Sequence, residues 1–144
     1  SQNPAKCELP RMLVNGLGSK PEACYFNEDF LAVFKCEKDL RLIKPDFKIL
    51  SMLDSRGVII TAPGNKYDFV SRAFFPKYII LEDPVTGSAH TKLIPYWYSR
   101  TGSKTFRAKQ ISERGGVVFC QYNESRVHIS GHARLYMKGE ILIP

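Results

Sequence analysis

The chain has 144 residues, of which 44% are hydrophobic, and it carries a formal net charge of +7. This length fits one domain, residues 1–144, with a buried core, and no apolar run approaches the roughly 20 residues that span a bilayer. The basic residues alternate with apolar ones, as on solvated faces, so we expect neither nucleic acid nor a membrane as a partner. The first residues carry no signal-peptide pattern, and we therefore expect a cytoplasmic location.

Four cysteines are spread along the chain without a C-x-x-C pair: Cys7, Cys24, Cys36 and Cys120. This spacing does not suit a zinc site, and the rest of the sequence offers no cluster of metal ligands, so we expect no metal. Reduced, partly buried thiols are the expectation for a cytosolic chain, and disulfides remain the alternative.

Strands and helices are predicted along most of the chain. Residues 1–20 are rich in Pro, Gly, Asn and Ser and predict an irregular lead-in. Apolar runs bounded by turn residues then predict strands at 23–26, 30–36, 57–62, 69–75, 78–81, 105–112, 116–122, 126–130 and 133–137. Helices are predicted at 45–53, where Pro45 and Asp46 suit the first turn, and from Gly87 to about Arg100.

The second predicted helix is more hydrophobic than a surface helix. Tyr96, Trp97 and Tyr98 follow one another and leave little room for a polar face, and a helix that is apolar nearly all round is buried. We therefore expect an α+β fold of about six to eight strands and two helices. In this fold a strand-rich sheet is rolled around a central buried helix.

The most informative segment is EDPVTGSAH, residues 82–90, which lies between a predicted strand and the second helix. A helix N-terminus presents unpaired N–H groups and a partial positive charge, so it can hold an anion such as a substrate carboxylate. Asp83 beside it would act as an acid, a base or a polar anchor, or only as a turn former. Ser88 is the helix N-cap or a substrate contact, and Gly87 suits a place where a ligand approaches the backbone.

Two further residues and one further segment have alternative interpretations. His90, on the first turn of the helix, is packed and hydrogen-bonded or else catalytic. Arg72 is flanked by aromatic residues, and it is an outward strand residue or it orders the nearby loop or a substrate carboxylate. The segment QISERGG, residues 110–116, predicts a bulge or tight turn beside a closely packed neighbour, and it lacks the spacing of a phosphate loop.

Five motifs in order resemble the PhzF-like phenazine-biosynthesis family: FVSRAFFP (69–76), EDPVTGSAH (82–90), PYW (95–97), QISERGG (110–116) and RVHISG (126–131). The resemblance implies a diaminopimelate-epimerase-like fold of two similar domains. Each domain is a sheet rolled around a central helix, and the active site lies between the two. The resemblance also implies an isomerase that moves a proton on a small carboxylated metabolite without a cofactor or metal.

Roles for individual residues follow from the resemblance together with the local chemistry. Asp83 stands in the loop where diaminopimelate epimerases carry a catalytic Cys, which argues against thiol-based racemase chemistry. The expected catalytic residues are Asp83 and Ser88, and the expected substrate-binding residues are Gly87, Ala89, Arg72 and His90. The backbone of residues 87–89 is expected to receive the substrate carboxylate.

The chain resembles only the C-terminal half of the family. The N-terminal half normally supplies a general acid/base glutamate in a Ser-Glu motif and a Gly-His-Pro loop, and no counterpart of either region is identified here. We therefore expect the C-terminal half of an isomerase that is inactive or nearly so alone and pairs with the missing half. The alternative is a non-catalytic binding or assembly module, which self-associates as a homodimer or pairs with a separate N-terminal half.

Overall fold

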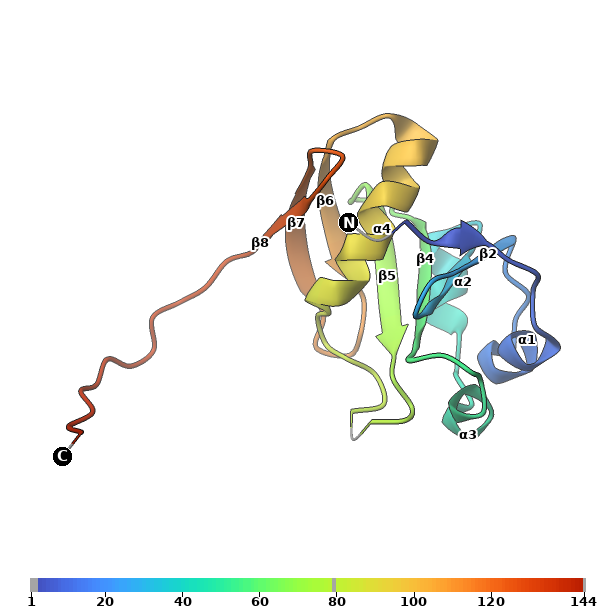
Figure 1. The fold of residues 1–144 in the computed structure, drawn as a ribbon, viewed down its shortest axis with the longest axis horizontal. Coiled ribbons are helices and arrows are strands. Elements are labelled where there is room, and N and C mark those ends of the chain that lie inside the picture. Colours follow the sequence, from blue (N-terminus) through green and yellow to red (C-terminus); the bar gives the residue numbers. More distant parts are fainter. Residues whose placement is uncertain (1–2, 79, 144) are drawn as a thin grey trace.

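A computed structural model describes residues 3–78 and 80–143, which form one sheet of eight strands in sequence order (Figure 1). The strands are β1 (Ala5–Lys6), β2 (Ala23–Phe26), β3 (Phe30–Val33), β4 (Val58–Pro63), β5 (Phe69–Phe74), β6 (Thr105–Gln110), β7 (Gly116–Tyr122) and β8 (Val127–Ser130). Neighbouring strands are antiparallel except for the parallel pairs β3–β4 and β5–β6. Each parallel pair requires a crossover connection, and helices form there.

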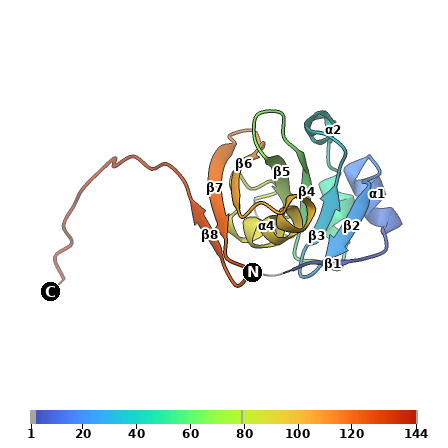
Figure 2. The same cartoon turned by 90° about the horizontal axis from the view of Figure 1, so that it is seen from above.

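Helices cover both faces of the sheet. α1 (Arg11–Leu17), α2 (Glu37–Leu42) and α3 (Phe47–Ser51) lie on one face, and α4 (Gly87–Thr101) lies on the other. β5 and β6 run antiparallel to β3 and β4, so right-handed crossovers place α4 opposite α2 and α3. The sheet curls around the side on which α4 lies (Figure 2). None of the helices in the described ranges combines the length and apolarity needed to cross a membrane.

The side chains of β4 are divided between two cores. Ile59 packs on the side of α4, whereas Val58 and Ile60 pack with α1, α2 and α3, because successive side chains of a strand point to opposite faces. Thr61 is a buried polar residue on the α4 side, and its Oγ1 accepts a hydrogen bond of 3.1 Å from Nε1 of Trp97. A strand covered on both faces has a nearly continuous apolar sequence, which explains the run that predicted β4.

The α+β class and most of the predicted elements are confirmed. Seven predicted strands correspond to the observed strands β2 to β8. The second predicted helix corresponds to α4. The helix predicted at 45–53 forms as the shorter α3. There Oδ1 of Asp46 accepts a hydrogen bond of 3.0 Å from the N–H of Ile49, which is the contact expected of an N-cap.

The irregular lead-in predicted for residues 1–20 is wrong, because this region contains β1 and α1. The helix α2 also has no counterpart among the predicted helices. Both helices are short, with seven residues in α1 and six in α2. Packing of Leu13, Leu17 and Leu40 into the core stabilises them, whereas helices of this length are marginal on propensity alone.

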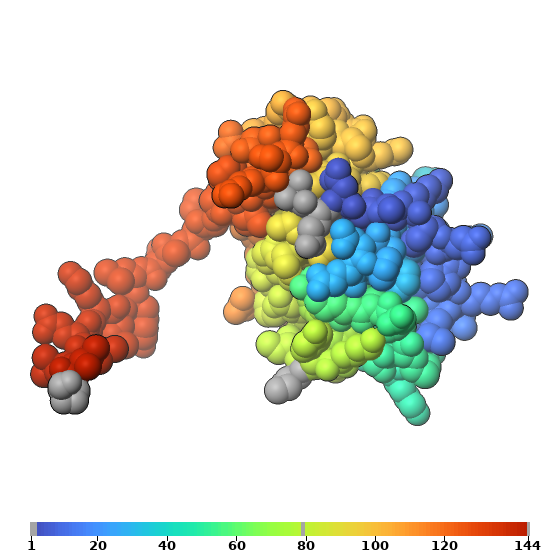
Figure 3. All heavy atoms as spheres, in the orientation of Figure 1, coloured from blue at the N-terminus to red at the C-terminus, as the bar shows by residue number. Residues whose placement is uncertain are grey.

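Two predicted strands do not form. Tyr78 and Leu81 lie in bends and Ile80 is irregular, and Glu82 pairs with Phe74 as an isolated bridge. Ile79, in the same prediction, lies outside the described residues. The strand predicted at 133–137 belongs to residues 131–143, here called the C-terminal tail, which form neither helix nor strand. The tail extends away from the domain (Figures 1 and 3). A strand needs a hydrogen-bonded neighbour, and within the described part of the chain none lies beside the tail.

Candidate functional site

A cavity of about 580 Å³ opens beside the N-terminus of α4. It is lined by the polar residues Arg56, Asp83, Thr86 and Ser88 and by the apolar residues Phe75, Tyr78 and Ile80. Cavities that bind small molecules have this size, and they combine apolar walls with a few polar groups. The structure therefore brings the two expected catalytic residues, Asp83 and Ser88, to one cavity.

The loop that carries Asp83 is held by its backbone and by its own side chains. The N–H of Asp83 donates to the carbonyl oxygen of Ala73 on β5 (3.0 Å). Oγ1 of Thr86 donates to Oδ2 of Asp83 (2.6 Å). This bond joins two side chains, whereas a turn-forming Asp bonds the backbone. Asp83 also lines the cavity, so its local bond is compatible with a role in binding.

Gln110, at the end of β6, fixes the same loop from the other side. Its Nε2 donates to the carbonyl oxygen of Asp83 (2.6 Å) and to Oγ1 of Thr86 (3.1 Å), and its Oε1 accepts from the N–H of Thr86 (2.9 Å). The side chain is fully buried, so these bonds are not in competition with water. The sequence indicated a tight turn here but not the role of Gln110.

The two glycines that follow Gln110 allow this close packing. A Cβ on Gly116 would lie 2.4 Å from Cγ2 of Val85, in the loop before α4. Gly115 has a φ of 65° and donates its N–H to Oγ of Ser112 (3.0 Å), and Oγ of Ser112 donates to the carbonyl oxygen of Pro84 (2.8 Å). The expectation of a tight turn beside a closely packed neighbour is confirmed.

The first turn of α4 lacks a side-chain cap. Thr86 occupies the N-cap position, but its side chain makes no capping hydrogen bond, because its Oγ1 bonds to Asp83 and Gln110 instead. The first N–H groups of a helix have no partner within the helix, so they remain available to an anion at this end. Ser88 lies inside the helix rather than at its N-cap, so the N-cap interpretation of Ser88 is wrong. A Cβ on Gly87 would meet nothing within 4 Å, so the space beside it is open.

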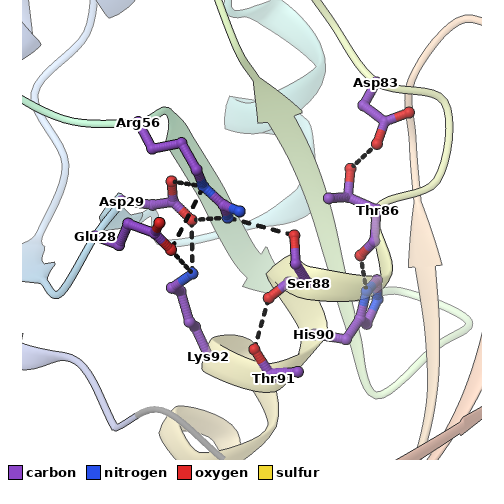
Figure 4. A network of polar contacts seen from close by, with 9 residues as sticks. All are labelled: Glu28, Asp29, Arg56, Asp83, Thr86, Ser88, His90, Thr91 and Lys92. Atoms are coloured by element: carbon purple, nitrogen blue, oxygen red, sulfur yellow. Dashed lines mark hydrogen bonds and ion pairs between the residues drawn. The ribbon is translucent and has the colours of Figure 1, made fainter.

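A network of charged groups, not anticipated from the sequence, adjoins Ser88 (Figure 4). Arg56 donates from Nε to Oδ1 of Asp29 (2.9 Å), from Nη2 to Oδ2 of Asp29 (2.5 Å) and from Nη2 to Oγ of Ser88 (3.3 Å). Nζ of Lys92, on α4, donates to Oδ2 of Asp29 (2.8 Å). Glu28 lies at the edge, 3.7 Å from Arg56 and 3.6 Å from Lys92.

Asp29 is the buried centre of this network. Burial would raise the pKa of its carboxyl, but the hydrogen bonds from Arg56 and Lys92 outweigh burial and lower the pKa below its ordinary value. The hydrogen bond to Asp29 likewise raises the pKa of Arg56. Asp29 and Arg56 therefore stay charged at neutral pH, and the guanidinium is fixed beside the cavity.

Arg72 lies away from the cavity, on the face of the sheet that packs against α2. It donates from Nε and Nη2 to the two oxygens of Glu82 (2.8 and 2.9 Å) and from Nη1 to the carbonyl oxygens of Leu40 (3.0 Å) and Ile43 (2.8 Å). This geometry favours the interpretation in which Arg72 orders the nearby loop. It does not bring Arg72 together with Asp83 and Ser88.

His90 and Ala89 are both fully buried and do not line the cavity. Nδ1 of His90 lies 2.8 Å from the carbonyl oxygen of Thr86, and its Nε2 has no hydrogen-bond partner in the described ranges. Burial lowers the pKa of the His90 imidazole, although the contact with Thr86 opposes this shift. The packed and hydrogen-bonded interpretation of His90 fits this position. For Ala89 only the backbone can serve an anion, because its side chain lies in the core.

Lys92 is the residue from which the sequence could have predicted the charged network of Glu28, Asp29, Arg56 and Lys92. It is the charged residue at the start of the buried run 92–97, whose other members are apolar or aromatic, and a buried charge requires a partner. Within the described residues, no group of three or more His, Cys, Asp and Glu side chains is placed to hold a metal ion.

Several known proteins have a similar sequence and a similar fold. The family model described as Phenazine biosynthesis-like protein, PhzC-PhzF, matches residues 13–139. Two Pseudomonas aeruginosa proteins, each named an uncharacterized isomerase, are 42% identical to this chain over 98% of its length and 54% of their own. The crystal structure of a PhzF-family phenazine biosynthesis protein from Enterococcus faecalis matches with a TM-score of 0.90 and 45% identity, over 98% of this chain and 55% of that one. A putative PhzC/PhzF protein from Clostridium difficile matches with a TM-score of 0.87 and 40% identity, over the same shares.

The fold and the cavity define an α+β domain with a cavity beside the N-terminus of a helix, and proteins named as isomerases have similar sequences. The chain belongs to the PhzC-PhzF family of phenazine biosynthesis-like proteins. The resemblance seen in the five sequence motifs is thereby confirmed. The chain spans about half the length of the curated relatives it matches.

Proposed function

We propose that this chain is the C-terminal half of a cofactor-independent isomerase that moves a proton on a small carboxylated metabolite. The observation that carries the proposal is the convergence of Asp83 and Ser88 on one cavity at the uncapped N-terminus of α4. The names of the relatives support the reaction class, since several are called isomerases.

The two ends of the cavity have different roles in this proposal. The N–H groups of residues 87–89 and the hydroxyl of Ser88 bind the substrate carboxylate, because the helix N-terminus is positive and open. Asp83, oriented by Thr86, binds and polarises the substrate next to the reacting carbon. The general acid/base glutamate belongs to the other half, so this chain alone is inactive or nearly so.

The position of the cavity suits closure by a second domain. Tyr78 and Ile80 line it, yet they are 59% and 58% exposed. Apolar side chains at the rim of a polar site are typical of a surface that a partner covers. We place the other half over this rim, as one of two similar domains that each curl around a central helix.

A hybrid protein tests the proposal. The Enterococcus faecalis relative is 45% identical to this chain over 55% of its own length, and this chain is joined to the part of that relative which it does not cover. Solvent deuterium exchange into a panel of small unsaturated carboxylates is then followed by proton NMR. We expect exchange by the hybrid, none above background by the chain alone, and a loss of about a hundredfold with Asp83→Ala in the hybrid. Exchange by the isolated chain that Asp83→Ala leaves undiminished would contradict these roles.

A second candidate function is a non-catalytic assembly module, and the C-terminal tail favours it. Its apolar side chains are 78–98% exposed: Leu135, Tyr136, Met137, Ile141, Leu142 and Ile143. Exposed apolar groups in this number mark an interaction surface, which a second copy or the other half would cover. Light scattering of the full chain and of a chain ending at Ser130 tests this. A dimer that needs the tail supports self-association, and a monomer without affinity for the other half contradicts the assembly role.

A further inference from the structure

Arg56 is the only positively charged side chain among the described residues that line the cavity. It lies at the end where α4 begins, since its Nη2 donates to Oγ of Ser88 at 3.3 Å. Neither Lys92, which is fully buried, nor Arg72, on the other face of the sheet, reaches this space. Any cation contact between this chain and a ligand in the cavity therefore falls to Arg56.

The guanidinium of Arg56 is held in one orientation. Asp29 accepts two of its hydrogen bonds, the N–H of Arg56 donates to the carbonyl oxygen of Glu28 (3.0 Å), and the guanidinium carbon lies 5.4 Å from the centre of the Phe75 ring. Nη1 donates no hydrogen bond within the part of the chain that the structure describes. A planar guanidinium fixed on one edge offers its remaining N–H groups in a defined direction.

The four formal charges of the network sum to zero, but the four groups are not equally buried. Asp29 is shared between Arg56 and Lys92, so these three groups together carry one net positive charge. Glu28 is the fourth member, but its side chain is 51% exposed and lies 3.6–3.7 Å from the two cations, where water weakens its effect. Without Lys92, Asp29 would cancel the charge of Arg56.

The hydroxyl of Ser88 adds a donor with a defined direction. Its oxygen accepts from Arg56, so its own proton is free to point into the cavity. Arg56 and Ser88 both line the cavity, which lies at the N-terminus of α4, where the first N–H groups have no side-chain cap. A carboxylate, with two planar oxygens, matches such a set of donors.

The other walls narrow the ligand class. Asp83 lines the same cavity, and its negative charge disfavours a dianion such as phosphate more than a singly charged carboxylate. Phe75, Tyr78 and Ile80 form the apolar part of the lining, which suits a flat hydrocarbon body.

We infer that Arg56 binds the substrate carboxylate and makes the cavity selective for carboxylates over neutral analogues of the same shape. The inference rests on the proposed function, and it adds a side chain from the segment before β4 to the residues of the 82–90 loop. Arg72 does not share this role.

The experiment uses the full chain and benzoate as the probe, followed by the ¹⁵N–¹H spectrum. In the unmodified chain, benzoate shifts the amide signals of Gly87, Ser88 and Ala89, and benzamide, its neutral analogue, does not. Arg56→Gln lowers the affinity for benzoate by about tenfold, and Arg56→Lys lowers it less, because a lysine keeps the charge without the planar donor pair. The dispersion of the same spectra shows that each variant is folded.

Arg114→Gln is the matched control, since it removes the same charge from an exposed residue near the 82–84 loop. It leaves the affinity for benzoate within about twofold. If benzoate binds at residues 87–89 but Arg56→Gln and Arg114→Gln weaken it equally, the inference about Arg56 is wrong and the proposed anion site survives. If benzoate shifts none of these signals in the unmodified chain, the anion site itself fails, and with it both proposals.

Discussion

Arg56 and Arg72 have similar local partners and very different surroundings. Each guanidinium donates two hydrogen bonds to one carboxylate, Arg56 to Asp29 and Arg72 to Glu82. Each also lies over a phenylalanine ring, at 5.4 Å and 4.9 Å from its centre. The difference is in the remaining N–H groups, because Nη1 of Arg72 donates to two backbone carbonyl oxygens, whereas Arg56 opens onto the cavity.

This difference separates a structural arginine from a binding one. A carboxylate partner orients a guanidinium in both cases, so an ion pair by itself does not identify a site. What matters is whether donors remain after the protein has used its own acceptors. The remaining N–H groups of Arg72 donate to carbonyl oxygens at the end of α2. Those of Arg56 would donate to a ligand in the cavity.

The largest expected effect is that of Lys92→Met, which tests the buried charge behind Arg56. The variant leaves Asp29, which has no exposed surface, with Arg56 as the one remaining ion-pair partner within the described ranges. We expect the free energy of unfolding to fall by about 3 kcal/mol, measured by urea denaturation. The double variant Asp29→Asn/Lys92→Met removes both charges and should recover part of this loss. A loss below about 1 kcal/mol for Lys92→Met would show that Asp29 is more solvated than its burial indicates.

The second largest effect on stability is expected for Arg72→Met, and its comparison with Arg56→Met tests the difference between the two arginines. It leaves the Glu82 carboxylate and the carbonyl oxygen of Ile43 without the Arg72 donor, while the carbonyl oxygen of Leu40 keeps the N–H of Ile43 at 3.4 Å. The expected loss is about 2 kcal/mol. Arg56→Met should lose about 1 kcal/mol, because Asp29 keeps Lys92 and Arg56 is partly exposed. We expect the opposite order for the affinity for benzoate, with a larger loss in Arg56→Met than in Arg72→Met. Equal stability losses together with equal affinity losses would mean that the two arginines do not differ in role.

The sequence allowed prediction of the part of the site that is continuous in the chain. Asp83, Gly87 and Ser88 lie in one segment, where a turn precedes an apolar helix, so their proximity follows from local structure. Asp29 and Arg56 are far apart in the chain and meet because β3 pairs in parallel with β4, with Phe30 opposite Val58. That register places the residues just before each strand side by side, and no local pattern reveals a register between distant strands.

Arg72 shows the complementary limit. Its aromatic neighbours left three interpretations open, an outward strand residue or one that orders the nearby loop or a substrate carboxylate, and its bonds to Glu82 favour the loop. When a strand is buried on both faces, however, the alternation of its side chains does not show which face meets the ligand. The fold class was predictable because apolar runs and turn residues mark strands regardless of their order in the sheet.

Gln110→Leu tests the link between the Asp83 loop and β6. It leaves the N–H of Thr86 and the carbonyl oxygen of Asp83 without partners in a buried place, at an expected loss of about 1.5 kcal/mol in unfolding free energy. Gln110→Glu is the matched variant, since it has the same shape but cannot donate to Asp83 when ionised. Hydrogen exchange of the Thr86 amide should quicken in Gln110→Leu and much less in Gln110→Glu, whose carboxylate still accepts from this N–H. Unchanged protection in Gln110→Leu would contradict this role.

The smallest expected effect is the pH dependence that His90 contributes. Burial lowers the pKa of this imidazole in the folded chain, whereas an unfolded histidine titrates near about 6.5. As the pH falls below that value, the unfolded chain binds a proton that the folded chain does not, so stability decreases until the pH reaches the lowered pKa. The decrease for one proton is at most about 1.4 kcal/mol per pH unit. Asp29 acts in a lower range, because a lowered carboxyl pKa keeps its contribution until the pH falls below about 4.

Urea denaturation at pH 7.5, 6.5 and 5.5 isolates this contribution. His90→Phe should flatten the dependence, whereas His128→Gln and His132→Gln, at exposed positions, should preserve it. The same slope in His90→Phe would mean that His90 is protonated in the folded chain, which requires an acceptor for its Nε2 that the described residues do not supply. His90 lies between the loop of Asp83 and the core beneath α4. A proton on its imidazole would therefore loosen the first turn of α4 and weaken the binding of benzoate beside Arg56. The ion pair between Arg72 and Glu82 would be unchanged.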